Sequence, residues 1–254
     1  MTDMQELRRY IAKSIAEFQK NHNVRDPLLF LILLDVSGSM NALVGKSGKR
    51  RIDLLKKAVL VFADALCCST EFAPYRQRAQ LAIASYSQDF NLLVPFCSAE
   101  QEVPDFQLTA QGITNSGTAL AEALDYIEMQ KAALSSTGNV RSLVLWLSDG
   151  NTSEQDLPNL QNVISREKNK ITILPFAIGS DAGVNMEELQ SVSNARNHQI
   201  VVMEKAKADV FNVLPNILMA SSVSFSKRHA NEQLDLSPLR LPSGVQIQMF
   251  SGVL

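Results

Sequence analysis

The chain contains one run of residues, 28–34, that limits the folds open to it more than any other feature. Every position in this run is apolar, which is typical of a strand that is covered on both faces. Such strands occur in sheets that have helices on either side. The run is also far below the roughly 20 apolar residues that span a bilayer, so we expect an internal strand and no membrane-spanning segment.

Strands and amphipathic helices alternate along the rest of the sequence. The expected strands cover residues 81–86, 90–94, 143–147, 171–178 and 199–203. The expected helices cover residues 52–68, 118–131, 157–167, 186–193 and 208–220. This alternation predicts a mostly parallel sheet with helices on both faces. The expected fold class is therefore α/β, with a Rossmann-like doubly wound sheet.

Two stretches depart from the strand–helix alternation. Residues 81–86 and 90–94 are separated only by Ser87, Gln88 and Asp89, a spacing suited to a hairpin. One edge of the sheet is therefore expected to be antiparallel. Residues 245–250 alternate well enough for one further short strand.

The length of 254 residues suits one large domain, which we place at residues 27–225. Residues 1–26 are expected to form an N-terminal amphipathic helix and a linker, and residues 226–254 a C-terminal arm or loosely held tail. Hydrophobic residues make up 46% and charged residues 20% of the chain, as in a soluble globular protein. The formal net charge of -2 gives no reason to expect nucleic acid or an anionic membrane as a partner.

The N-terminal segment and the cysteines indicate a cytoplasmic location. Charged residues are interspersed among the apolar residues near the N-terminus, so the uncharged core of a secretion signal is missing. The cysteines, Cys67, Cys68 and Cys97, form neither a paired framework nor a CxxC motif. We expect them to be buried thiols in a reducing compartment.

Oxygen-bearing side chains stand at two predicted strand ends and at one predicted helix start. Asp35 closes the apolar strand, and Asp149 closes a later strand. Ser37 and Ser39 alternate in the loop after Asp35, so both hydroxyls can face one point, and Thr118 stands at or near the N-terminus of a helix. In a doubly wound sheet, ligands bind beyond the carboxyl ends of the strands, where the strand order reverses. If the two strands are neighbours, the five side chains meet in one crevice.

This all-oxygen set of side chains suits a hard cation such as Mg²⁺ or Mn²⁺ rather than zinc or copper. Magnesium prefers six ligands in octahedral geometry and gives up water reluctantly. We therefore expect three hydroxyls and several waters around the ion, with the two carboxylates mainly holding those waters. An ion that is under-neutralised in this way attracts an external carboxylate. The predicted chemistry is the docking of an acidic partner, which needs no general base or nucleophile.

Three motifs, in order along the chain, resemble those of a known family. "DVSGS" follows the apolar strand, "SGTALAEAL" opens a helix and "LWLSDG" ends a later strand. Together they are similar to the metal-ion-dependent adhesion site (MIDAS) of the von Willebrand factor type A domain family. The resemblance implies a Rossmann-like sheet, direct metal contacts from Ser37, Ser39 and Thr118, and contacts through water from Asp35 and Asp149. The segment "FQLTAQGITNSGTALAEAL" looks most like bacterial cytoplasmic members, including those encoded near tellurite-resistance genes.

Two features leave alternatives open. The segment "GITNSGT" offers Thr114 as a rival ligand, but Thr118 is preferred because Leu120 and Leu124 follow it on the inward face of the helix. The loop at 41–51 is long and basic, and it could steer an acidic partner toward the metal; a solvated loop and helix face is the simpler interpretation. The basic residues in and after this loop are Lys46, Lys49, Arg50, Arg51, Lys56 and Lys57.

Phosphate chemistry is the strongest competing function. Gly45-Lys46-Ser47 resembles the end of a P-loop, and its lysine would hold a nucleotide phosphate in an NTPase. Met40 stands where that motif requires glycine, and the lysine does not follow the strand closely. An aspartyl phosphatase would need a second acid at the position of Ser37.

The sequence also lacks the residues that hydrolysis by a serine nucleophile requires. It would require a histidine base near the serines, and none of His22, His198 and His229 ends a predicted strand. Trp146 lies in an apolar strand and is expected in the core. The sequence therefore predicts a non-catalytic, metal-dependent protein-binding module whose Mg²⁺ or Mn²⁺ accepts an Asp or Glu of a protein partner. A structural scaffold with an inactive site is the other alternative.

Overall fold

The structure covers most of the predicted domain and part of the segment that follows it. The computed structural model describes residues 26–44, 48–134, 138–166, 171–178, 183–203, 208–227, 232–239, 241 and 245–249. The N-terminal helix expected within residues 1–26 lies outside these segments, and so does Gly45-Lys46-Ser47.

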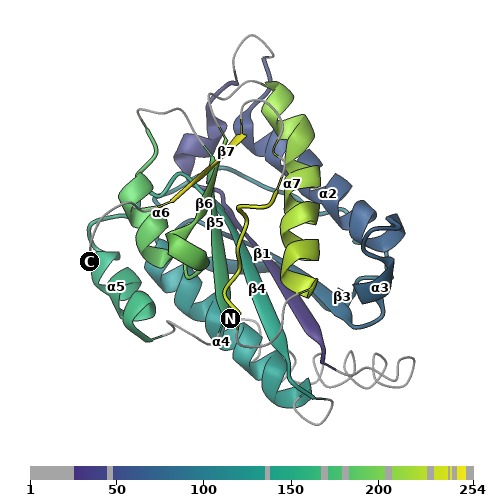
Figure 1. Cartoon of the computed structure of the whole chain (residues 1–254). Coiled ribbons are helices and arrows are strands. Elements are labelled where there is room, and N and C mark those ends of the chain that lie inside the picture. The colour runs from purple at the N-terminus through teal and green to yellow at the C-terminus, as the bar shows by residue number, and fades with distance from the viewer. Residues whose placement is uncertain are drawn as a thin grey trace.

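A 7-stranded sheet with the order β3-β2-β1-β4-β5-β6-β7 forms the centre of the molecule (Figure 1). Its strands are β1 (Leu28–Asp35), β2 (Ala79–Tyr86), β3 (Phe90–Ser98), β4 (Arg141–Ser148), β5 (Thr172–Ile178), β6 (Ile200–Met203) and β7 (Val245–Gln248). Strands β2, β1, β4, β5 and β6 pair in parallel. The α/β doubly wound class predicted from the sequence is confirmed.

Both edges of the sheet are antiparallel, whereas the sequence predicts one such edge. The expected hairpin forms the first edge, where β3 pairs with β2. The second edge is β7, which pairs with β6 so that Ile200 faces Gln248 and Met203 faces Val245. Residues 245–250 were expected to hold a short strand, but sequence alone does not show which strand it joins.

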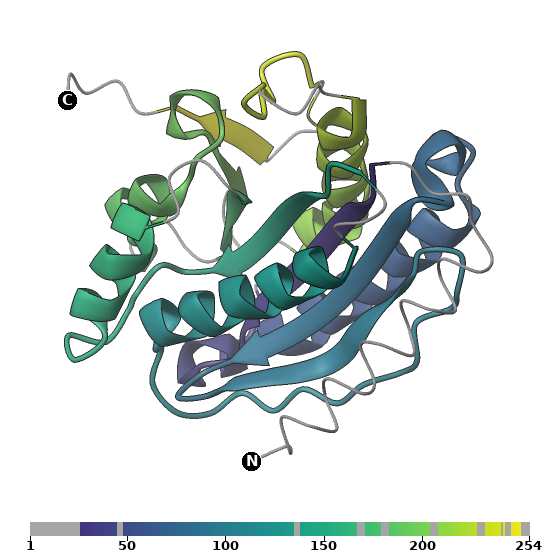
Figure 2. The ribbon, with the colours of Figure 1, turned by 90° about the horizontal axis from the view of Figure 1, so that it is seen from below.

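Helices cover the two faces of the sheet. The helices are η1 (Gly38–Asn41), α2 (Arg51–Cys68), α3 (Ala73–Arg76), α4 (Ser116–Leu134), α5 (Leu157–Arg166), α6 (Met186–Val192), η4 (Arg196–His198) and α7 (Ala208–Lys227). Helices α2 and α7 pack on one face, and α4, α5 and α6 pack on the other. Figure 2 shows α4 and α2 on opposite sides of the strands.

The alternation of side chains along β1 creates two cores. Leu28, Phe30, Ile32 and Leu34 pack with α2 and α7, while the intervening leucines pack with α4, α5 and α6. Every residue of β1 is buried, which explains why its sequence is apolar throughout. Trp146 is also fully buried, as predicted.

The described part of the C-terminal segment packs into the core. Leu234 and Leu236 are each 0% exposed. The backbone N–H of Leu236 donates to Gln199 Oε1 at 2.7 Å, and that of Arg196 donates to Leu234 O at 2.7 Å. Asp235 pairs with Arg196 at 2.7 Å. The described part of the predicted arm, 226–254, therefore holds the β6 side of the sheet.

The cysteines correct one expectation. Cys67, Cys68 and Cys97 are free, but Cys68 is exposed and the other two are partly exposed. Cys67 and Cys68 form the end of α2, and Cys97 lies on the edge strand β3, so both places border solvent. Within the described segments, no helix is both long and apolar enough to cross a bilayer.

Candidate metal centre

The reversal in strand order lies between β1 and β4, and it brings two carboxylates together. Asp35 ends β1, and Asp149 directly follows β4, the parallel neighbour of β1. The chain leaves β1 toward β2 and returns on the other side as β4, so this is the switch point at which doubly wound sheets bind ligands. The condition set by the sequence, that these two strands are neighbours, is met.

Two serines join these carboxylates into one hydrogen-bonded cluster. The backbone N–H of Ser37 donates to Asp35 Oδ1 at 2.8 Å. The hydroxyls of Ser37 and Ser39 lie 3.2 Å apart, and Ser39 Oγ donates to Asp149 Oδ2 at 2.8 Å. Asp35, Ser37 and Asp149 are buried, whereas Ser39 is exposed. The cluster therefore reaches the surface at Ser39.

The surroundings of Asp35 disfavour its charged form. Burial, with a further contribution from the charge of Asp149, raises the pKa of Asp35 to about 6. Hydrogen bonds from Ser37 and Ser148 act in the opposite direction but do not offset the burial. A cation placed between the carboxylates would favour both charged forms. The donor set and its electrostatics therefore fit a hard divalent ion.

A chain of buried hydrogen bonds fixes the Asp35 carboxylate from the interior of the protein. Trp146 Nε1 donates to the hydroxyl of Tyr86 at 2.8 Å, Tyr86 donates to Ser148 Oγ at 3.1 Å, and Ser148 donates to Asp35 Oδ2 at 2.9 Å. Burial, and next the charge of Asp35, raise the pKa of Tyr86 well above its usual value. The sequence indicated a core position for Trp146, and Ser148 stands beside Asp149, but nothing in the sequence linked Tyr86 to Asp35.

Thr118 does not join the cluster. Its hydroxyl donates to Asp156 Oδ1 at 2.5 Å and accepts from Asn159 Nδ2 at 3.2 Å. No hydrogen bond between described residues links it to Asp35, Ser37, Ser39 or Asp149. The reason is the start of α4: the helix begins at Ser116, so residue 118 lies in its first turn, where Asp156 binds the free backbone N–H groups.

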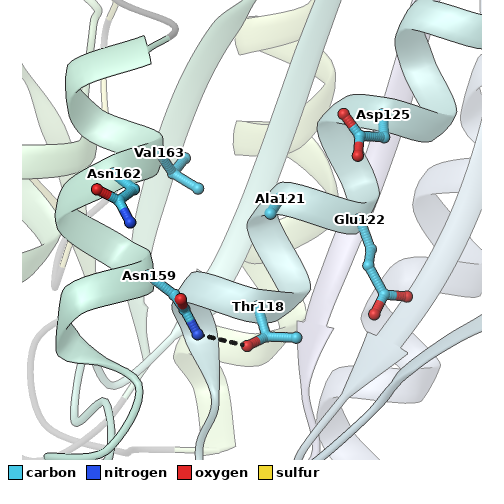
Figure 3. A pocket seen from close by; sticks show the side chains of 7 residues that line it. All are labelled: Thr118, Ala121, Glu122, Asp125, Asn159, Asn162 and Val163. Atoms are coloured by element: carbon cyan, nitrogen blue, oxygen red, sulfur yellow. Dashed lines mark hydrogen bonds between the residues drawn. The ribbon is translucent and has the colours of Figure 1, made fainter.

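Thr118 instead lines a pocket between α4 and α5 (Figure 3). The other lining residues are Ala121, Glu122, Asp125, Asn159, Asn162 and Val163. Figure 3 shows Thr118 directed toward Asn159, with Glu122 and Asp125 farther along α4. This pocket is separate from the cluster around Ser39.

Thr114, the rival ligand, lies in a loop that runs beside the serines. Gln111 N donates to Val36 O at 2.9 Å, and Gly38 N donates to Gly112 O at 3.1 Å. On the other side, Ser153 N, from the segment after Asp149, donates to Thr114 O at 2.7 Å. Thr114 is 8% exposed, and its hydroxyl makes no hydrogen bond within the described part of the chain. The backbone thus places Thr114 between the two ligand-bearing segments with a free hydroxyl.

The loop after Asp149 is fixed to α6. Asn185 N donates to Asp149 O at 2.9 Å. The backbone N–H and hydroxyl of Thr152 donate to the Glu188 carboxylate at 3.2 and 2.5 Å. Burial raises the pKa of Glu188 to about 7, and nearby Asp149 adds to the effect. Sequence analysis missed Glu188 because only the tertiary fold brings it to this loop.

The described segments place no histidine beside the serines of the cluster. His198 lies in η4, where its Nδ1 is 2.7 Å from Ser193 O, and no described histidine is bonded to Ser37 or Ser39. No group of three or more His, Cys, Asp and Glu side chains with metal-ligand geometry occurs among the described residues. The candidate centre is the hydroxyl-rich cluster, which has two carboxylates and whose serine hydroxyls are not among these residue types.

Comparison with solved structures shows the fold. PilB minor pilin from Streptococcus sanguinis has a TM-score of 0.55 and 11% identity over 81% of this chain and 64% of its own. VWA2 of Sulfolobus acidocaldarius, a paralog of ArnB, has a TM-score of 0.52 and 14% identity over 77% of this chain and 45% of its own. The chain therefore spans less than two thirds of these solved chains.

A third structure is similar and contains a metal. Proximal thread matrix protein 1 from the mussel byssus, with a zinc-occupied MIDAS motif, has a TM-score of 0.51 and 16% identity. The match covers 78% of this chain and 46% of that one. No curated protein matches the chain in sequence.

The family model for the von Willebrand factor type A domain matches residues 30–215, which is more than half of the chain. This range contains most of β1, all of β2 to β6 and every residue of the candidate centre. Domains of this family bind divalent metal at a MIDAS and mediate protein–protein interaction. The chain belongs to the von Willebrand factor type A domain family.

Proposed function

We propose that this protein is a non-catalytic, divalent-metal-dependent protein-binding module. The observation that carries the proposal is the hydroxyl bridge between two carboxylates from neighbouring strands: Ser39 donates to Asp149 and lies 3.2 Å from Ser37, whose backbone binds Asp35. The cluster is buried at the two acids and exposed at Ser39, so a bound ion could be reached from outside.

The residues that would hold the ion are Asp35, Ser37, Ser39, Thr114 and Asp149. Thr114 takes the place expected for Thr118, because its hydroxyl is free and its loop touches both ligand-bearing segments. Mg²⁺ and Mn²⁺ suit this all-oxygen set best. When bound, the ion would supply a coordination position for an Asp or Glu side chain of a partner protein.

The chain's own groups would keep the centre ready for that ligand. Neutral hydroxyls leave much of the ion's charge uncompensated, while Ser37 N and Ser148 Oγ hold Asp35 in place. The two serine hydroxyls are bonded to each other, that of Ser39 is also bonded to Asp149, and no described histidine is bonded to either serine, which supports binding instead of nucleophilic catalysis. The free cysteines and the segment at 106–124 support a cytoplasmic bacterial protein related to those encoded near tellurite-resistance genes.

The test is thermal denaturation of the full chain with Mg²⁺, with Mn²⁺ and with a chelator. Either metal is expected to raise the melting temperature of the wild type. Asp35→Ala, and Ser37→Ala combined with Ser39→Ala, should remove this increase while the circular dichroism spectrum stays that of the folded chain. Metal responses equal to wild type in these variants would defeat the proposal.

A matched pair of variants separates the two threonines. Thr114→Ala should weaken Mn²⁺ binding about tenfold or more, the size expected when a hydrogen-bonding or ligating group at a charged site is lost. Thr118→Ala should leave Mn²⁺ affinity near the wild-type value. A nucleotide analogue that binds the wild type but not Lys46→Ala would favour the competing NTPase instead.

A further inference from the structure

Arg51, the first residue of α2, is a buried arginine beside the candidate centre. The residue is 9% exposed. Its Nη1 donates to Ser39 O at 3.5 Å, a long contact, and its Nε is buried without a hydrogen-bond partner. Across the described residues, no carboxylate pairs with this guanidinium.

The other arginines whose side chains the structure describes are better paired. Two of them form salt bridges, with Asp53 at 2.8 Å and with Asp235 at 2.7 Å. The others donate to backbone carbonyl groups, among them those of Ser69 and Ser226. Together, these arginines are Arg50, Arg76, Arg78, Arg141 and Arg196. Arg51 is therefore exceptional in combining burial with a single long hydrogen bond.

The fold brings Arg51 back to Ser39 through the basic loop. Leu43 and Arg50 form an antiparallel bridge, and Arg51 N donates to Ala42 O at 2.9 Å. This small hairpin places Arg51 against the carbonyl of Ser39, while the hydroxyl of the same serine binds Asp149.

A buried charge without a partner is unfavourable, and removing one half of a buried ion pair is strongly destabilising for that reason. A charged group in this state is expected to find its partner in a ligand. A partner that neutralises Arg51 would be an anion, and none of the described residues supplies one. The position beside Ser39 places that anion at the exposed side of the metal cluster.

We propose that Arg51 is a second anchor for the carboxylate that docks at the metal centre. This inference rests on the proposed function and names the contact that fixes its ligand. One carboxylate oxygen would face the ion, and the other would accept a hydrogen bond from the guanidinium. The planar donor fork of arginine matches a carboxylate better than the point charge of lysine does. Arg51 thereby selects a carboxylate over a neutral oxygen ligand such as a serine or asparagine side chain.

The test uses the full chain loaded with Mn²⁺ and acetate as the probe. Acetate binding is followed by water-proton relaxation, because a carboxylate that replaces water on Mn²⁺ lowers the relaxation enhancement. Arg51→Gln should bind acetate about tenfold more weakly, the effect of losing a charge-assisted hydrogen bond. Its Mn²⁺ affinity should be equal to wild type or higher, because a nearby positive charge is gone. Arg51→Lys should retain part of the acetate affinity.

Arg50→Gln is the matched control, since Arg50 is adjacent, exposed and paired with Asp53. It should change neither affinity. Wild-type acetate affinity in Arg51→Gln, with Mn²⁺ bound normally, would overturn this inference while leaving the metal-binding function intact. Failure of the wild type to bind Mn²⁺ would overturn both.

Arg51→Met provides a second readout that does not depend on acetate. This variant keeps an apolar stem and removes the unpaired charge, so its melting temperature without metal or ligand should exceed that of wild type. A lower melting temperature together with unchanged acetate binding would show that Arg51 is a structural residue, and the inference would be wrong.

Discussion

Hydrogen bonds hold the Asp35 carboxylate in place, while its surroundings disfavour its charged form. Ser37 and Ser148 donate to its two oxygens, but burial and Asp149 raise its pKa to about 6 from an ordinary value of 3.8. The geometry of the carboxylate is thus fixed in a state that disfavours its charge. Such preorganisation is typical of sites that await a charged ligand.

This conflict predicts a pH-dependent effect of Asp35→Asn in metal-free protein. Between pH values of about 4 and 6, the folded chain keeps a proton on Asp35 that the unfolded chain releases, so wild-type stability falls as the pH rises through this range. Asparagine has no charge to bury. The variant should therefore gain stability relative to wild type across this range, with a constant advantage above a pH of about 6.

Urea denaturation in the presence of a chelator, from pH 4 to pH 8, measures this difference. Asp64→Asn, at an exposed position of α2, is the control and should show no such pH trend. A difference between wild type and Asp35→Asn that stays constant over the whole range would contradict the prediction.

At the scale of elements, α4 and the segment between β4 and α5 form one unit. The Asp156 carboxylate accepts from Gly117 N at 2.6 Å, Thr118 N at 3.1 Å and Thr118 Oγ1 at 2.5 Å. A Cβ at Gly117 would lie 2.2 Å from Leu160 N, so only glycine allows this approach. Asp156 thus caps a helix that is distant in sequence and fixes the loop carrying Thr114 relative to Asp149.

Asp156→Ala should destabilise the chain by about 1–2 kcal/mol, the usual effect of losing a helix N-cap. It should also weaken Mn²⁺ binding, because two ligand-bearing segments lose their common anchor. Chemical denaturation and calorimetric titration with Mn²⁺ measure the two effects. Glu154→Ala, at an exposed position of the same segment, should change neither quantity, and equal behaviour of the two variants would refute the role of Asp156.

For the molecule as a whole, the C-terminal segment completes the sheet. Leu234 and Leu236 are fully buried against the core that also contains α2 and α7, and β7 covers the edge of β6. An uncovered edge strand would offer unpaired backbone groups to other chains. The segment therefore contributes both to the core and to the closure of the sheet.

Leu236→Ala is expected to lower the free energy of unfolding by about 2–5 kcal/mol, as for other fully buried leucines. Met249→Ala, at a side chain that is 52% exposed, should change it by less than about 0.5 kcal/mol. Urea denaturation of both variants makes the comparison. Equal, small effects would show that the C-terminal segment does not belong to the cooperative core.

Local sequence patterns predicted those parts of the fold that depend on residues close together in the chain. The apolar run of β1 and the acids at two strand ends identified Asp35 and Asp149 as candidates, and the strand order then brought them together. Leucine spacing identified the inward face of α4 but not its first residue, so it favoured Thr118 over Thr114. The pairing of β7, and the contacts made by Tyr86 and Glu188, depend on residues far apart in sequence, and no local pattern encodes them.

The chain from Trp146 through Tyr86 and Ser148 to Asp35 has a practical consequence. The sequence contains 1 tryptophan, and its indole is connected to the carboxylate that would sit beside the ion. Intrinsic fluorescence of the unlabelled protein should therefore change when that carboxylate changes its charge or its partner, and Tyr86→Phe should silence the signal. Trp146 is therefore a built-in fluorescence probe that is hydrogen-bonded, through Tyr86 and Ser148, to the candidate metal centre.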